Sequence, residues 1–105
     1  MAVKTPLPDA AIVEDTARIL RCLGHPARLR ILDYLEREGE RTVSEIHEAL
    51  GLGQATASQH LSLMHDKGIL RRRKEGVNVF YEIGDARALK VLACIRGSVA
   101  SELGV

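Results

Sequence analysis

The stretch from Thr42 to Gly68 constrains the fold more than any other part of the sequence. It contains two apolar patterns of helical period, separated by the tripeptide Gly51-Leu52-Gly53. The residues of the two patterns are Val43, Ile46 and Leu50, then Ala57, Leu61 and Met64. Glycines at such a junction allow a tight turn, so the sequence predicts two short helices packed at a sharp angle.

The exposed face of the second of these helices is unusual. Surface helices commonly carry long charged side chains, but no Asp or Glu occurs from Gly53 to His65. Small polar residues stand there instead, namely Thr56, Ser58, Gln59 and His60. Such side chains suit a helix that enters the major groove of DNA, because they allow close approach and can bond to bases or phosphates.

The hydrophobic period then changes from helical to alternating. Val77, Val79, Tyr81 and Ile83 alternate with Asn78, Phe80 and Glu82. This pattern predicts two strands joined by a turn at Gly76. The first strand carries four consecutive basic residues, Arg71, Arg72, Arg73 and Lys74. Alternation along a strand sends about half of them to each face. A basic hairpin beside a groove-reading helix favours phosphate binding over a merely charge-protected sheet edge.

The remaining segments read as helices. The apolar residues between Ile12 and Leu23 follow helical spacing, and Asp9 is a possible cap for this helix. Gly24 and Pro26 end it and begin a second helix. The second helix carries Leu29, Leu32 and Leu35 on one stripe, flanked by Ile31. Thr42 with Glu45 forms a capping-box pattern, and Asp85 precedes a final helix. The predicted fold is mainly α with a β-hairpin wing, a winged helix-turn-helix of order α-α-α-α-β-β-α. Residues 1–8 are expected to be a flexible arm, and 9–105 one DNA-binding and dimerisation domain.

Composition limits the functional classes. Of 105 residues, 46% are hydrophobic and 28% charged, which is an ordinary globular balance, and a net charge of +1 names no partner. We see no secretory signal and no apolar run of about 18 residues, so we expect a cytoplasmic protein without membrane contact. No catalytic constellation or phosphate-binding glycine loop stands out, so an enzyme is not expected.

Three motifs in order closely resemble the ArsR/SmtB family of bacterial winged-helix repressors. They are "LGHPARLRILDYL", "TVSEIHEALGLGQATASQHLSLMHDKGIL" and "RRRKEGVNVFYEI". The resemblance runs from about Ala10 to the end of the chain. It implies a homodimer formed largely by the first and last helices, which binds an inverted-repeat operator in double-stranded DNA and is released by an inducer.

The resemblance also indicates which residues contact DNA. Family contacts correspond to two residues at the start of the third helix and several on the fourth helix, and the basic hairpin adds candidates from its own charge. The full set of candidates is Thr42, Ser44, Gln54, Ala55, Thr56, Ser58, Gln59, His60, Arg71, Arg72, Arg73, Lys74 and Asn78. One departure is Gly53, where family members often have Ser, so the fourth helix must begin without that side-chain cap.

Most ligands of the family's two metal sites are replaced in this sequence. Thr42 and Ser44 replace the Cys-x-Cys of one site. In the other, Asp85 remains, but Arg87 replaces a histidine, and Ser98 and Ser101 occupy the later ligand positions. The four histidines lack chelating spacing, and His25 reads as a packing or capping residue and His47 as lying on an outer face. We therefore expect no metal and no cofactor.

Cys22 and Cys94 are the remaining candidates for a sensing site. If the first and last helices pack together at the dimer interface, the two thiols could approach, and a disulfide or polysulfide bridge could release DNA. Alternatively, both are small buried hydrophobes. The thiol-sensing members of the family use other positions, here Asp33 and about Ala100. The inducer therefore stays open, and so does a second function, a winged-helix module for protein–protein contact that binds no operator.

Overall fold

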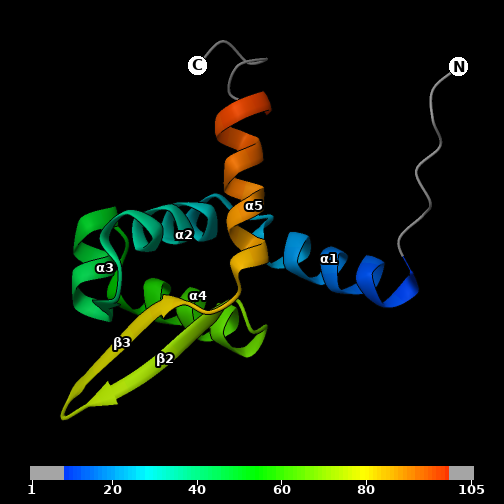
Figure 1. Ribbon diagram of the computed structural model, residues 1–105. Coiled ribbons are helices and arrows are strands. Elements are labelled where there is room, and N and C mark those ends of the chain that lie inside the picture. The colour runs from blue at the N-terminus through cyan, green and yellow to red at the C-terminus, as the bar shows by residue number, and fades with distance from the viewer. Residues whose placement is uncertain (1–8, 100–105) are drawn as a thin grey trace, which may run out of the picture.

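The computed structural model describes residues 9–99, with side chains described up to Gly97. The elements in chain order are α1 (Ala10–Leu23), α2 (Pro26–Glu38), β1 (Arg41–Thr42), α3 (Val43–Leu50), α4 (Gln54–Asp66), β2 (Leu70–Glu75), β3 (Asn78–Ile83), α5 (Ala86–Cys94) and η1 (Ile95–Val99). Figure 1 shows the β2–β3 hairpin projecting from the helical body on the side away from α1. The predicted winged helix-turn-helix order is confirmed.

Two elements were not predicted, the short strand β1 and the π-helical turn η1 that continues α5. Some expectations fall outside the described residues. These are the arm at residues 1–8, the end of the final helix after residue 99, and the positions Ala100 and Ser101, which correspond to sensor sites of the family.

The predicted helix caps are present. The Asp9 carboxylate accepts a hydrogen bond from the Ile12 backbone N–H at 3.0 Å. Thr42 Oγ1 accepts from the Glu45 N–H at 3.1 Å, while Glu45 Oε1 accepts from the Thr42 N–H at 2.9 Å. These bonds satisfy N–H groups that the first helical turn leaves without partners, so the sequence itself determines where α1 and α3 begin.

The wing belongs to a three-stranded antiparallel sheet of order β1-β3-β2. Arg72 pairs with Tyr81 in the β2–β3 register, and Arg41 pairs with the same residue from the other side. Gly76 at the hairpin turn has φ +60°, as predicted. Val77, the next residue of the turn, is 96% exposed.

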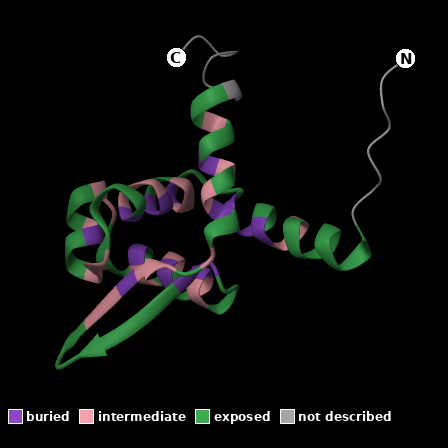
Figure 2. Ribbon diagram, in the orientation of Figure 1, coloured by how far each residue is buried: buried purple, intermediate pink, exposed green. Residues whose placement is uncertain are grey.

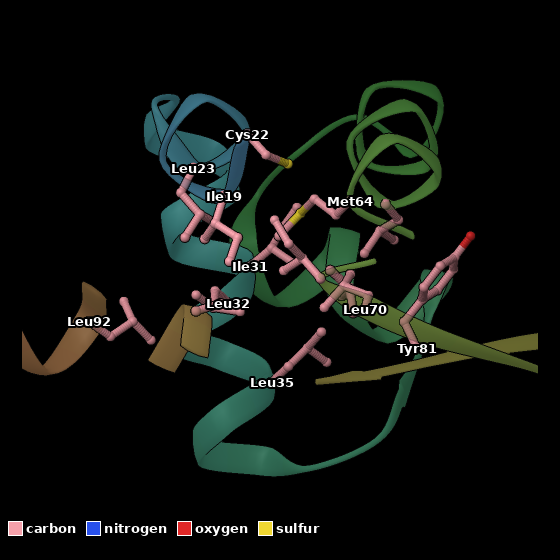
Figure 3. Packing of buried hydrophobic residues seen from close by; sticks show 14 residues of the cluster. Ile19, Cys22, Leu23, Ile31, Leu32, Leu35, Met64, Leu70, Tyr81 and Leu92 are labelled. Carbon is pink, nitrogen blue, oxygen red and sulfur yellow. The ribbon is translucent and has the colours of Figure 1, made fainter. Parts of the chain in front are cut away.

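The core lies where α2, α4 and the sheet meet (Figure 3). Ile31, Leu32 and Leu35 are almost fully buried, while Leu29 is only half-buried. The predicted stripe therefore packs against the core, with Leu29 at its edge, and the flanking Ile31 is buried more deeply than Leu29. Helical spacing alone allowed both, and the position of the neighbouring helices decided between them.

Helix α1 is only partly packed within one chain. It buries Ile19, Cys22 and Leu23 near its end, whereas Ile12, Val13 and Leu20 are each at least half exposed. Figure 2 shows the outer turns of α1 exposed over most of their surface. No helix in the described range is long and apolar enough to cross a membrane.

Candidate nucleic-acid interface

Helix α4 has one fully buried face and one open face. Ala57, Leu61 and Met64 have no exposed surface, as predicted, and they fix the helix against the core. Four residues near the start of α4 are exposed, namely Gln54, Ala55, Thr56 and Gln59. No side chain caps the helix at Gly53, so the first N–H groups of α4 lack a side-chain partner. An anionic partner is favoured at such an end.

His60 is held differently from its neighbours. Its Nδ1 accepts a hydrogen bond from Arg28 Nε at 3.1 Å, and its ring lies 4.5 Å from that of His25, which caps α2. Burial, and then electrostatic repulsion involving His25 and Arg28, lower the pKa of His60. The His60 ring therefore links α4 to the start of α2. Its Nδ1 is occupied by Arg28, so only the remaining atoms of the ring are candidates for contact with DNA.

The start of α3 lies beside α4 and the wing. Thr42 is engaged as the helix cap, while Ser44 is exposed. A shallow cavity of about 200 Å³ joins the three elements, and its lining includes Thr42, Ser44, Gln54, Ser58 and Asn78. These predicted contact residues come from three separate segments, so the fold brings them to one surface.

A second cavity of about 510 Å³ continues this surface along the wing. Its lining includes Ser58 and Ser62 of α4 together with Arg72 and Lys74 of β2. Ser62 was not predicted, although its position four residues after Ser58 places it on the same helix face. Arg72 and Lys74 thus lie beside the open face of α4, where they add positive charge to its polar surface.

Arg71 and Arg73 have other partners. Arg71 Nε lies 3.2 Å from Glu82 Oε1 on the adjacent strand. Arg73 bonds with Glu40 and Glu75, and its guanidinium carbon lies 4.4 Å from the centroid of the Phe80 ring. These hydrogen bonds raise the pKa of Arg73 and lower that of Glu40. The four basic residues therefore divide by strand face into two groups.

The two cysteines line different cavities. Cys22 is 4% exposed, and burial raises the pKa of its thiol despite nearby cations. Cys94 is exposed and lines a different, largely apolar cavity of about 450 Å³ with residues of α1 and α5. Both thiols are free. The thiol switch stays a prediction, and the two sulfurs differ in their access to a reagent.

Two other predicted positions have specific partners. The Asp85 carboxylate, the one ligand kept from the family's second metal site, caps α5 and accepts from Arg87 Nη2 at 2.8 Å. His47 is half-buried rather than on an outer face, with its Nδ1 3.3 Å from the Leu52 carbonyl oxygen. No cluster of three or more metal ligands occurs within residues 9–99.

Comparison with known proteins agrees with this geometry. The sequence pattern described as "Bacterial regulatory protein, arsR family" matches residues 25–72. A probable mercury resistance operon repressor of Streptomyces lividans is 37% identical over 83 residues, which are 79% of this chain and 66% of that protein. The transcriptional repressor PagR of Bacillus anthracis is 36% identical over 75 residues, 71% of this chain and 75% of PagR.

Solved structures share the fold. A homodimeric winged helix-turn-helix DNA-binding domain from Mycobacterium bovis, described as a possible ArsR-family regulator, is 33% identical. It superposes with a TM-score of 0.73 and covers 97% of this chain and 92% of that domain. Sequence, fold and the surface around α4 lead to one assignment. The chain belongs to the ArsR family of winged-helix DNA-binding transcriptional regulators, which are not enzymes.

Proposed function

We propose that this protein is a homodimeric repressor that binds an inverted-repeat operator with α4 in the major groove and is released by an inducer. One observation carries the proposal. The open face of α4 has no carboxylate from Gly53 to His65, and it is bordered by Arg72 and Lys74. Phosphates repel carboxylates and attract these cations, so the surface suits duplex DNA.

The dimer is supported by the surface of α1. Ile12, Val13 and Leu20 are exposed, although a small domain gains stability by burying apolar surface. The cavity between α1 and α5, lined by Ile19, Leu20 and Val91 among others, continues this apolar face. A second copy related by a two-fold axis covers both, and it presents two α4 helices to two half-sites.

A binding experiment tests the proposal. The wild-type protein is incubated with its own upstream DNA and with duplexes selected from a random pool, at 50 to 200 mM salt. We expect a palindromic selected sequence and an affinity that falls steeply with salt. The Arg72→Ala/Lys74→Ala variant should lose affinity for every duplex. Failure to bind any duplex at low salt, with a stable protein partner recovered instead, would favour the protein–protein module.

Release by an inducer is the second part of the proposal. A thiol switch would act at Cys94, which lines the cavity that the second copy covers, so its oxidation would disturb the dimer; Cys22 is buried within one chain with a raised thiol pKa. Operator release is measured with oxidised, polysulfide-treated and metal-loaded protein. Cys94→Ser should abolish a thiol response and Cys22→Ser should weaken it only if a bridge forms. Identical release of wild type and both variants would assign induction to another site.

A further inference from the structure

A basic groove lies on the other side of α4 from the wing. It has a volume of about 280 Å³ and is lined by Arg18, Arg21, Cys22, Arg28, Leu63 and Lys67. These residues come from the second half of α1, the start of α2 and the end of α4. Four of the six are permanent cations and none is acidic. We call this set the α1–α4 groove.

Two of the cations are fixed in place by the fold. Arg28 donates from Nη1 to the Cys22 carbonyl oxygen at 3.1 Å, in addition to its bond with His60. Arg18 donates to the Lys67 carbonyl oxygen, and its nearest carboxylate is Asp15 at 3.9 Å. These bonds join α1, α2 and α4, so the groove is part of the packed structure rather than a chance meeting of surface side chains.

The other two cations are unpaired. Arg21 and Lys67 are exposed, and their side chains form no ion pair or hydrogen bond within the part of the chain that the structure describes. Three of the four cations, Arg28, Lys67 and Arg18, also act to lower the pKa of the Cys22 thiol, which lines the same groove, against the larger effect of burial. Four like charges around one concavity repel each other unless an anion enters it.

The location of the groove relative to α4 limits which anion can reach it. Thr56, His60, Leu63 and Lys67 follow one another at helical spacing, so the groove borders the same helix that carries the DNA-reading face. In Figure 1, α1 and the hairpin extend from opposite sides of α4. If α1 and α5 form the dimer, the groove lies toward the two-fold axis and the wing lies away from it.

We infer that the α1–α4 groove binds backbone phosphate of the operator between its two half-sites, while the wing binds phosphate at the outer flanks. This inference rests on the proposed function. Each α4 would then be held between two phosphate contacts from opposite sides, which fixes its depth and register in the groove. Arg21 and Lys67 supply the free charges, and Arg18 and Arg28 position them.

The test compares two variants that lose positive charge in different places. Arg21→Ala/Lys67→Ala removes the free cations of the groove, and Arg37→Ala removes a cation from the outer surface of α2, where it pairs with Asp33. Binding to the selected operator is measured from 50 to 200 mM salt. For the groove variant we expect a slope of log affinity against log salt that is shallower by about 0.9 per lost phosphate contact. Arg37→Ala should keep the wild-type slope.

Uncharged methylphosphonate linkages locate the contact. Placed between the half-sites, they should weaken binding of the wild type and leave the groove variant almost unaffected. Placed at the outer flanks, they should weaken both proteins but not the Arg72→Ala/Lys74→Ala variant. Thermal melting of each variant checks that the fold is retained.

Several outcomes separate the possibilities. If the groove variant and Arg37→Ala bind the operator alike, or if central methylphosphonates have no effect, the inference is overturned while the repressor function stands. Saturable binding of inorganic phosphate by the wild type, with an unchanged operator slope in the groove variant, would assign the groove to a free anion and also overturn it. If the wild type binds no duplex, the proposed function itself fails.

Discussion

Arg73 holds Glu40 through two hydrogen bonds, one from Nη2 to Oε1 at 2.7 Å and one from Nε to Oε2 at 3.2 Å. The two residues are 33 positions apart in the chain, and their bond joins β2 of the wing to the segment between α2 and β1. Arg72, the preceding residue, lines the cavity beside α4. The two neighbouring arginines therefore differ in their contacts: Arg73 holds the wing to the segment before β1, and Arg72 lies at the surface proposed to bind DNA.

Glu40→Gln tests this bracing role. The substitution removes a negative charge, so a purely electrostatic effect would strengthen DNA binding. Because the bond orients the wing, we expect weaker binding instead, together with faster amide hydrogen exchange in β2 and β3. Both are measured on the same preparations by binding titration and mass spectrometry.

Arg72→Ala serves as the comparison for Glu40→Gln. It should weaken binding to all duplexes and reduce the salt slope by about 0.9 per contact without changing exchange in the hairpin. Tighter DNA binding by Glu40→Gln would contradict the bracing role. It would mean that Arg73 contacts phosphate itself and that Glu40 competes with the phosphate for it.

Gln59→Ala should relax the sequence preference at one base pair in each half-site. Gln59 is exposed near the middle of α4, and a glutamine bonded bidentately to adenine contributes about 1 to 3 kcal/mol of discrimination. Competition among single-base operator variants measures the effect. A uniform loss for all sequences would instead make Gln59 a backbone contact.

Leu20→Glu should convert the dimer to a monomer. Leu20 is 50% exposed on α1, and a buried carboxylate without a partner is costly at an interface. Analytical ultracentrifugation reads the oligomeric state. Val77→Glu makes the same apolar-to-acidic change at the wing tip, where the residue is 96% exposed, and should remain dimeric. A dimeric Leu20→Glu variant would place the interface elsewhere.

Leu61→Ala should destabilise the fold by about 2 to 5 kcal/mol, because it opens a cavity beneath α4. Leu61 has no exposed surface. The free energy of unfolding in urea provides the measurement, and Ser62→Ala on the exposed side of the helix should change it by less than about 0.5 kcal/mol. Equal effects of the two substitutions would contradict the assigned orientation of α4.

Stability should fall on mild acidification because of His60. Burial first, and then His25 and Arg28, lower its pKa below the ordinary value of 6.5. Between the lowered pKa and 6.5 the unfolded chain therefore binds more protons than the folded one, so stability rises with pH across this window and is lost as pH falls. Urea midpoints at pH 5 and 7.5 measure it, and His60→Gln should show a smaller difference. An unchanged difference would assign the effect to other groups.

Local patterns in the sequence were enough for much of the fold. Asp9, Thr42 and Glu45 mark helix starts because each cap needs only residues within three positions. Gly76 marks the hairpin turn because its φ of +60° strains other residues. The buried face of α4 follows from the spacing of Ala57, Leu61 and Met64, and the carboxylate-free stretch from Gly53 to His65 indicates the DNA-binding helix.

What only the tertiary structure decided depends on partners far away in the chain. Four consecutive basic residues on a strand predict that alternate side chains point to opposite faces of the wing. The sequence does not say that Arg73 binds Glu40 while Arg72 lies beside α4. Nor does it show that Lys67 joins arginines of α1 and α2 in one groove, since those residues are separated by about forty positions or more. The physical reason is that caps and turns are satisfied locally, whereas an ion pair or a charged groove exists only after separate helices and strands have packed together.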